Sequence, residues 1–111
     1  LLKPGGIWIT AMPNCTSADA AHYGRFWAAY DVPRHLWHHN PDTLSFFAKK
    51  TRFRINKIST LPLDVFYISI LSEKYKGTGF HFLKGILKGS LFALQSLSDK
   101  EKSSSLIYLL Q

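Results

Sequence analysis

The sequence has little cysteine, few acidic residues and no apolar run of membrane-spanning length. Its single cysteine, Cys15, excludes an internal disulfide and a metal site built from several cysteines. Because a protein without disulfides is suited to a reducing compartment, we expect a cytoplasmic location. A helix that crosses a bilayer needs roughly 20 apolar residues, and no run in the sequence approaches that length. What is present is enough hydrophobic residues, 46% of the chain, for a modest core.

The shortage of acidic residues leaves the chain basic. There are 14 Lys and Arg against 7 Asp and Glu, which gives a formal net charge of +7. A basic patch is the usual electrostatic footprint of a nucleic-acid-binding protein. Here the basic residues form only loose groups, so we expect a solvated surface and no nucleic-acid partner. These groups are Lys49, Lys50, Arg52, Arg54 and Lys57, and further along Lys84 and Lys88.

A glycine-rich turn of the kind that holds a nucleotide cofactor is also missing. Such a turn follows an apolar strand and opens a helix. The glycine clusters, Gly5-Gly6 and Gly77-Thr78-Gly79, do not stand in that position. We therefore expect no cofactor-binding residues in this chain.

Three short apolar runs predict the strands of an α/β fold. The first lacks strict alternation of apolar and polar residues, which indicates a strand buried on both faces. In the second, Phe53 and Ile55 fall on one side and Ile58 on the other, so we expect a β-bulge or a twisted edge strand. The third is apolar at nearly every position and is predicted to be central in the sheet. The strands are Ile7–Met12, Phe53–Leu61 and Ser105–Leu110.

Helix signals separate these strands. Asn40 can cap a helix, Pro41 suits its first turn, and Asp42 interacts favourably with the helix dipole. Asp64 is predicted to cap a later helix, which the glycines at 77 and 79 terminate. The predicted helices are a short one at Ala18–Gly24 and longer ones at Pro41–Lys50, Val65–Tyr75 and Phe80–Leu97.

The helix at Phe80–Leu97 has features that leave its role open. Gly85 and Gly89, four residues apart, permit another element to approach closely. The apolar stripe could cover the sheet or a partner subunit in a homo-oligomer. Alternatively, a basic helix with an apolar stripe can lie on a membrane surface or bind a lipid-linked substrate. The apolar stripe consists of Leu83, Ile86, Leu87, Leu91 and Leu94, and the basic one of Lys84 and Lys88.

The segment from Tyr23 to Phe47 is densest in groups that bind ligands. It places aromatic residues, two arginines and three histidines between a predicted strand and a helix start. Segments in this position carry the ligand contacts of many α/β enzymes. Pro33 favours an extended backbone at Val32, so Asp31–Leu36 is predicted to be a loop of defined shape.

Aromatic and charged residues of this segment are candidates for substrate contact. Trp27, Tyr30 and Trp37 could form a lid over a planar substrate, and the alternative is that they hold the loop onto the core. Arg34 could bind a substrate carboxylate or phosphate, with Asp31 in the same substrate-binding set. The alternative for Arg34 is a salt bridge to Asp31 or an interaction with the helix cap.

The histidines are the candidates for catalysis. His35 or His38 could act as a general base, because an imidazole accepts a proton near neutral pH. The alternative is a hydrogen bond inside the loop. Together with His39 they could ligate a metal, but of the nearby carboxylates, Asp31 and Asp42, the second is explained by the helix start. We expect no metal site.

These motifs together resemble the C-terminal half of class I S-adenosylmethionine-dependent methyltransferases, in the small-molecule group similar to ubiquinone-biosynthesis enzymes. The motifs are Leu2–Gly6 before strand five of that fold, Ile7–Asn14 at the strand and its exit, Tyr23–Trp27 and Asp31–His38 above the active site, and Asn40–Leu44 at the next helix. The later segment, from Leu63 to Leu110, resembles the helical insertion and final strand of one bacterial subgroup. The chain departs from the family at Thr51-Arg52, where a glycine usually makes the turn.

The resemblance implies the C-terminal part of a Rossmann-like, seven-stranded α/β sheet. The chain would supply strands five, six and seven, the last antiparallel, with a helical insertion at 63–102. It would contribute to methyl transfer from S-adenosylmethionine to a small-molecule acceptor, and the cofactor would be held by a portion upstream of Leu2–Gly6. The implied roles are catalysis for His35 and His38, and substrate binding for Trp27, Tyr30, Asp31, Arg34 and Trp37.

The start of the chain points the same way. It opens LLKPGG, without a methionine and at what resembles the end of a helix, so we expect a portion of a longer protein that is inactive alone. Two other hypotheses stay open. One is a basic binding module that engages a membrane surface or nucleic acid, and the other is an inactive fragment that self-associates through an exposed sheet edge.

Overall fold

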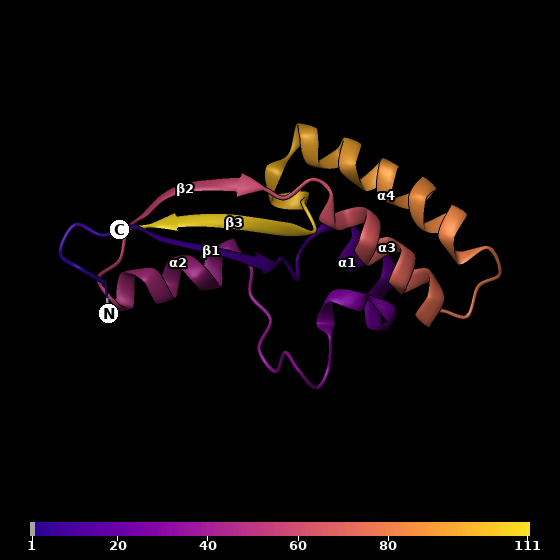
Figure 1. Cartoon of the computed structure of the whole chain (residues 1–111), viewed down its shortest axis with the longest axis horizontal. Coiled ribbons are helices and arrows are strands. Elements are labelled where there is room, and N and C mark those ends of the chain that lie inside the picture. Colours follow the sequence, from indigo (N-terminus) through magenta and orange to yellow (C-terminus); the bar gives the residue numbers. More distant parts are fainter. Residues whose placement is uncertain (1) are drawn as a thin grey trace.

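Three strands form one antiparallel sheet in the computed structural model, which describes residues 2–111 (Figure 1). The last strand, β3 (Ser105–Leu110), lies between β1 (Trp8–Pro13) and β2 (Ile55–Thr60). It runs antiparallel to both, so β1 and β2 are parallel to each other. The prediction of a central strand at Ser105–Leu110 is confirmed, and four of its six residues are fully buried.

A β-bulge interrupts β2, as the sequence predicts. Ile55 pairs with Leu110 and Lys57 with Leu109, so Asn56 is the extra residue. The bulge changes the alternation of side chains along the strand. As a result, Ile55 and Ile58 both pack against the same hydrophobic cluster.

Helix α2 (Pro41–Lys50) covers one face of the sheet and has the bounds that the sequence predicts. The Asn40 side chain accepts a hydrogen bond from the amide of Thr43, and the Thr43 hydroxyl accepts one from the amide of Asn40. This capping box satisfies two donors at the helix start. The core beneath the helix comprises Leu44, Ala48, Leu106, Tyr108 and Leu110.

The turn after α2 is made without glycine. Arg52 adopts a φ of 63°, in the left-handed region that glycine most readily occupies. The Phe53 amide donates to the Ala48 carbonyl oxygen at 2.8 Å, which closes the helix end. The departure from the resembled family at Thr51-Arg52 therefore leaves the helix-to-strand turn intact.

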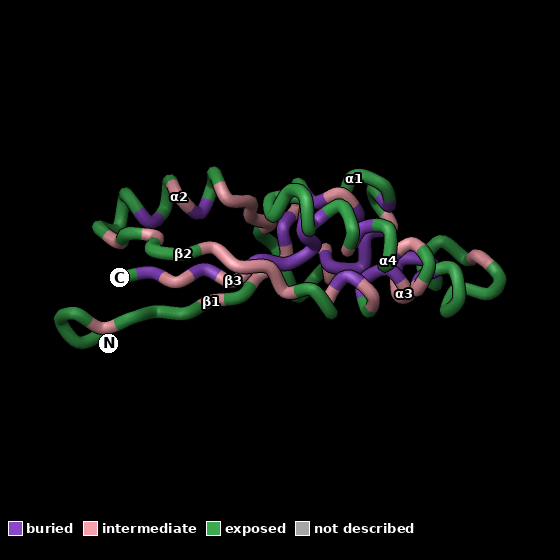
Figure 2. Tube along the Cα trace, turned by 90° about the horizontal axis from the view of Figure 1, so that it is seen from above, coloured by how far each residue is buried: buried purple, intermediate pink, exposed green. Residues whose placement is uncertain are grey.

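The remaining helices form a second layer beyond one end of the sheet (Figure 1). The molecule is therefore elongated, and it measures 52 × 31 × 20 Å along its principal axes. Figure 2 shows the buried residues gathered in this layer and along β3. The second hydrophobic cluster comprises Ala20, Tyr23, Trp27, Ala28, Ala29, Val65, Ile68 and Phe92. The elements are α1 (Ala18–Tyr23), two 3-10 helices η1 (Gly24–Phe26) and η2 (Ala28–Tyr30), α3 (Asp64–Tyr75), α4 (His81–Ser98) and a third 3-10 helix η3 (Lys100–Lys102).

Helices α3 and α4 pack closely at the two glycines, as the sequence predicts. A Cβ atom added at Gly85 would lie 2.5 Å from the Ile70 Cα atom. One added at Gly89 would lie 2.9 Å from the Phe66 ring. Glycine is required at these positions because the backbone of one helix contacts the other directly. The helices of this pair and η3 occupy the predicted helical segment 63–102; its status as an insertion stays a prediction.

Two expectations about exposure are wrong. The first strand is not buried on both faces, because β1 is an edge strand in residues 2–111 and only one sheet face is covered by α2. Ile7 and Ile9 are 55% and 64% exposed. The leucines of the α4 stripe do not cover the sheet either, because α4 packs on α3 through its glycine face.

The predicted cap at Asp64 is also wrong. Asp64 is the first residue of α3, and the cap residue is Leu63, which makes no side-chain cap bond. From inside the helix the Asp64 carboxylate instead accepts a hydrogen bond from the Ser105 hydroxyl. Asp64 thereby joins the start of α3 to the start of β3.

Within residues 2–111, no helix combines the length and apolarity that crossing a membrane requires.

Glu73, on α3, is a buried carboxylate that links this helix to α1 and to the turn before α4. Its side chain accepts hydrogen bonds from the Tyr23 hydroxyl at 3.2 Å and the Thr78 hydroxyl at 2.7 Å. Burial alone would raise the pKa of Glu73, but the Thr78 and Tyr23 hydroxyls, with Lys76 and Lys84 nearby, lower it below its usual value. The ionised form is therefore favoured by folding.

The Glu73→Gln variant is expected to lose a pH-dependent part of the stability. A lowered pKa in the folded state stabilises the protein above the ordinary value of 4.5 and is lost as the pH falls through the folded value. The gap in stability between the native protein and the variant should thus be largest at neutral pH and shrink in acid, as measured by urea unfolding. Glu101→Gln, at an exposed carboxylate, is the matched control. A gap that is constant with pH would contradict the prediction.

Candidate functional site

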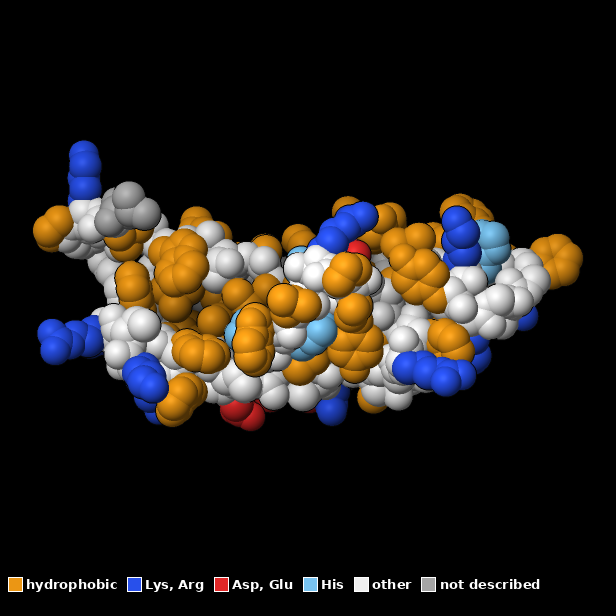
Figure 3. Space-filling view, turned by 90° about the horizontal axis from the view of Figure 1, so that it is seen from below, with side chains coloured by type: hydrophobic (Ala, Val, Ile, Leu, Met, Phe, Trp, Pro, Cys, Tyr) orange, Lys and Arg blue, Asp and Glu red, His pale blue; other side chains and the backbone are white. Residues whose placement is uncertain are grey.

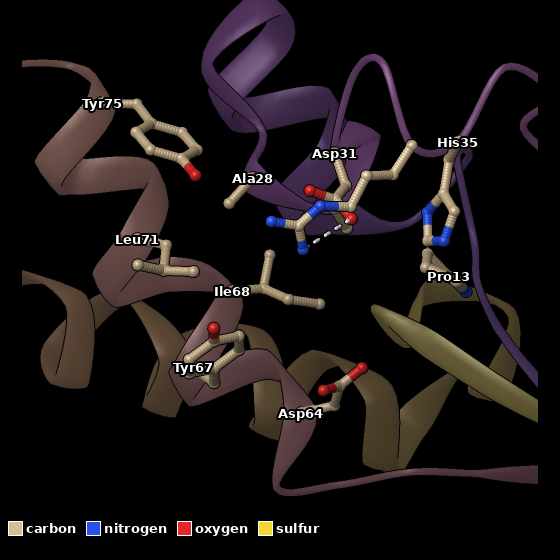
Figure 4. A pocket seen from close by; sticks show the side chains of 11 residues that line it. Pro13, Ala28, Asp31, His35, Asp64, Tyr67, Ile68, Leu71 and Tyr75 are labelled. Carbon is tan, nitrogen blue, oxygen red and sulfur yellow. Dashed lines mark ion pairs between the residues drawn. The ribbon is translucent and has the colours of Figure 1, made fainter.

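A cavity of about 350 Å³ lies between α3 and the chain that follows α1 (Figure 4). One wall is the face of α3 that carries Tyr67, Ile68 and Tyr75, and the other comes from η2 and the loop after it. The cavity is lined by Pro13, Ala28, Ala29, Asp31, Arg34, His35, Asp64, Tyr67, Ile68, Leu71 and Tyr75. Sequence reasoning places Asp31, Arg34 and His35 together in this loop, and the structure brings all three to the cavity.

The loop holds these residues through a tight local turn. Asp31 ends η2 in the left-handed region, with a φ of 42°, and its carbonyl oxygen accepts from the His35 amide at 3.1 Å. The Val32-Pro33 peptide bond between them is cis. This turn places the side chains of Asp31 and His35 on the cavity wall, in agreement with the predicted loop of defined shape.

Asn14 fixes the base of the same loop. Its Nδ2 donates to the carbonyl oxygens of Glu101 at 2.6 Å and Ser103 at 3.1 Å, and the residue is 1% exposed. The next amide, that of Cys15, donates to the His39 carbonyl oxygen at 3.0 Å. The two ends of the segment from Asn14 to His39 are therefore joined, and both are anchored to the approach to β3.

The charged pair at the cavity mouth is weak. Arg34 Nη1 lies 3.8 Å from Asp31 Oδ2, and the Arg34 side chain is 83% exposed. A solvent-exposed ion pair of this length contributes little to stability. The structure thus shows the salt bridge that was the alternative for this pair. Because the salt bridge is long and exposed, a bound anion could replace Asp31 as the partner of Arg34.

The cavity has an apolar floor and a polar rim. Ile68, Leu71 and the alanines of η2 form the floor. Carboxylate, guanidinium, imidazole and phenol groups surround it, from Asp31, Asp64, Arg34, His35, Tyr67 and Tyr75. Such a combination suits a small molecule with an apolar body and polar substituents.

The two candidate catalytic histidines have different surroundings. His35 is exposed and lines the cavity. His38 does not line it: its Nε2 lies 3.0 Å from the Tyr30 carbonyl oxygen, to which it donates, and its ring packs edge-on against the Tyr30 ring. Both histidines, with Trp37, line a smaller neighbouring hollow of about 160 Å³. His38 therefore has the loop hydrogen bond that was its structural alternative, whereas His35 is free to meet a ligand.

The three aromatic residues do not form one lid. Trp27 is 1% exposed in the core, and its Nε1 donates to Asp19 Oδ2 at 2.7 Å. Tyr30 packs between the Trp27 and His38 rings and does not line the main cavity. Trp37 is 82% exposed beside the smaller hollow. We therefore correct the assignment of Trp27 to substrate contact, because its burial by α1 and α3 makes it a core residue.

The loop forms an apolar surface around these hollows. Val32, Leu36 and Trp37 are 72%, 74% and 82% exposed. Figure 3, which views the molecule from the loop side, shows hydrophobic side chains and histidines in the middle of this face, with a basic side chain beside them and most other Lys and Arg side chains towards the ends of the molecule. Among residues 2–111, no cluster of three His, Cys, Asp or Glu side chains could hold a metal ion.

Sequence reasoning misses the contribution of α3 to the site. Asp64, Tyr67, Leu71 and Tyr75 all line the cavity, and Tyr67 is 65% exposed beside it. Their spacing of three or four residues puts them on one helix face. That spacing is the signal that could have found them, but only the fold shows that this face meets the loop.

Comparison with protein-family models and with curated proteins finds no match for this chain.

Proposed function

We propose that this chain is the acceptor-binding portion of an S-adenosylmethionine-dependent methyltransferase. The observation that supports it most is the position of the cavity. The parallel strands β1 and β2 end at the same edge of the sheet. Pro13, the last residue of β1, and Asp64, at the start of the helix that follows β2, both line the cavity. Ligands of α/β enzymes bind beyond the carboxyl ends of the parallel strands. The resemblance of the flanking motifs then indicates which α/β family to test.

The sheet suits a portion of a larger domain. β1 is an edge strand of the sheet in residues 2–111, and Ile7 and Ile9 beside that edge are exposed. In the proposal, upstream strands pair with this edge and complete a seven-stranded sheet, with helices over the open face. An exposed apolar edge otherwise promotes self-association, which is the competing explanation for these residues.

The cofactor is not held by this chain in the proposal. Gly5, with a φ of 76°, precedes β1, and Gly77, with a φ of 73°, joins two helices. Neither turn leads from a strand into a helix, as a cofactor cradle requires. The residues present therefore do not fit the cofactor. In the proposal, an upstream portion of the same protein binds it, and the enzyme is cytoplasmic.

The described residues account for acceptor binding. The floor formed by Ile68 and Leu71 would take the apolar body of the acceptor, and Arg34 would bind an anionic substituent in place of Asp31. His35 would accept the proton of the acceptor oxygen or nitrogen. Because the sulfonium of S-adenosylmethionine is already activated, alignment of the acceptor supplies most of the rate acceleration.

Calorimetric titration of S-adenosylmethionine tests the proposal. We expect micromolar binding to the complete gene product that contains this chain and no heat of binding with residues 1–111 alone, because the chain has no cofactor cradle. The demethylated product, S-adenosylhomocysteine, should behave in the same way. Absence of binding to the complete product would rule out a methyltransferase. Binding to residues 1–111 alone would show that the cofactor site has been assigned to the wrong part of the protein.

A further inference from the structure

Helix α4 presents its most hydrophobic face to solvent. Its buried residues, Gly85, Gly89, Phe92 and Ser96, face α3 and the core. On the opposite side lie Leu83, Leu87, Leu91 and Leu94, here called the leucine face, with exposed fractions of 58%, 59%, 54% and 64%. In an amphipathic helix that only supports a core, the leucines would be turned inward and the small residues outward. The leucine face is thus not explained by packing within residues 2–111.

Basic residues border this face. Lys84 and Lys88 each follow a leucine of the face in sequence, so they lie along one side of it at 100° per residue. The 18 residues of α4 contain no Asp or Glu. The end of α3 adds Lys74 and Lys76, and the turn before α4 adds Phe80, which is 84% exposed. The surface therefore combines apolar side chains with positive charge of one sign.

We propose that the leucine face binds the surface of an anionic lipid bilayer. A helix with leucines on one side and lysines at the border lies in the interfacial plane, with its apolar face among the acyl chains and its lysines at the headgroups. The lysine stems can extend along the apolar surface to reach those headgroups. In Figure 1, α4 lies on the outside of the molecule along α3, where a flat surface can approach its whole length.

Charge favours lipid over the other occupants. A second copy of the chain would bring the same lysines together, and like charges across an interface oppose association. Nucleic acid would satisfy the lysines but would leave the leucines exposed to water, and their burial is the stronger need. An anionic bilayer satisfies both groups at once. This inference does not depend on methyl transfer, since it rests on a surface apart from the cavity.

Vesicle sedimentation with the complete gene product tests this proposal. We expect binding to vesicles of phosphatidylcholine mixed with phosphatidylglycerol, much weaker binding to phosphatidylcholine alone, and loss of binding at high salt. Leu87→Ser combined with Leu91→Ser should reduce binding at least about tenfold, because two leucines no longer enter the bilayer. Lys84→Glu should reduce binding to the anionic vesicles alone.

Control variants at other surface positions test whether vesicle binding depends on the leucine face itself or on the total number of exposed leucines and lysines. Leu63→Ser, at a leucine that is 78% exposed elsewhere, and Lys49→Glu, on α2, should leave vesicle binding unchanged. Circular dichroism checks that each variant is folded. Absence of vesicle binding would overturn the proposal, as would binding to DNA that Leu87→Ser and Leu91→Ser do not affect. A dimer in sedimentation velocity that these two substitutions dissociate, without vesicle binding, would assign the face to a second copy instead.

Discussion

Replacement of Trp27 by alanine is expected to lower the free energy of unfolding by about 3–5 kcal/mol, since removal of a buried tryptophan leaves a large cavity. Trp27 lies at the centre of the helical layer and is 1% exposed. Its loss also removes the hydrogen bond to Asp19, which is fully buried and whose Oδ1 has no partner within residues 2–111. A carboxyl group without its donor adds to the cost. This loss is a large part of the stability of a typical domain.

Urea unfolding followed by far-ultraviolet circular dichroism measures this effect. Tryptophan fluorescence is unsuitable, because the substitution removes the buried reporter and leaves Trp8 and Trp37, which are 46% and 82% exposed. Trp37→Ala is the control and should change stability by no more than about 0.5 kcal/mol. Trp27→Phe keeps most of the ring and should lose about 1–3 kcal/mol through the hydrogen bond. If Trp27→Ala were as stable as the control, the placement of Trp27 in the core would be refuted.

Replacement of Gly85 by alanine is expected to lower the free energy of unfolding by about 2 kcal/mol. The added methyl group would lie 2.5 Å from the Ile70 Cα atom, so the two helices must move apart. Overpacking costs about 1–3 kcal/mol, and more where backbone must move. The higher helix propensity of alanine offsets only about 1 kcal/mol of this. Thermal unfolding should therefore show a lower midpoint despite a better helix former.

Two other glycines give the internal comparison. Gly89→Ala should cost less, because the nearest atom, at 2.9 Å, belongs to the Phe66 ring, which can turn. Gly79→Ala, with no atom within 4 Å of the added carbon, should have almost no effect. The order Gly85, Gly89, Gly79 is the diagnostic result. A Gly85→Ala variant more stable than the native protein would mean that α3 and α4 do not approach this closely.

Features governed by neighbouring residues could be predicted from the sequence. Asn40 and Pro41 define the start of α2 through capping and a fixed φ, both local effects. The mismatch between Ile55 and Ile58 predicts the bulge because side chains alternate along any strand. The spacing of Gly85 and Gly89 predicts a close helix contact. The loop position likewise groups Asp31, Arg34 and His35, and the structure places all three at one cavity.

Features that depend on distant packing could not be predicted. Trp27 stands among residues typical of a ligand lid, and only the docking of α3, some 40 residues later in the chain, buries it. The leucines of α4 define a stripe, but periodicity does not say whether a stripe faces inward or outward. Tyr67 is unremarkable in the sequence, and its place in the cavity follows from the direction in which α3 leaves β2. The misplaced cap at Asp64 has the same origin, since Ser105 is its partner.

The two walls of the cavity are tethered to neighbouring residues in one run of three serines, Ser103–Ser105. Asn14, at the root of the loop wall, bonds to the backbone of Ser103 and Ser104, and Asp64, at the root of the α3 wall, bonds to Ser105. The two walls are therefore anchored at one place, here called the serine anchor. Near this anchor we expect the walls to move together, so that their separation changes little. We therefore expect the width of the cavity to vary most at the far ends of the walls, near Arg34 and Tyr75. We expect amide hydrogen exchange to be slow at the serine anchor and faster towards Arg34 and Tyr75, where the walls are not held together.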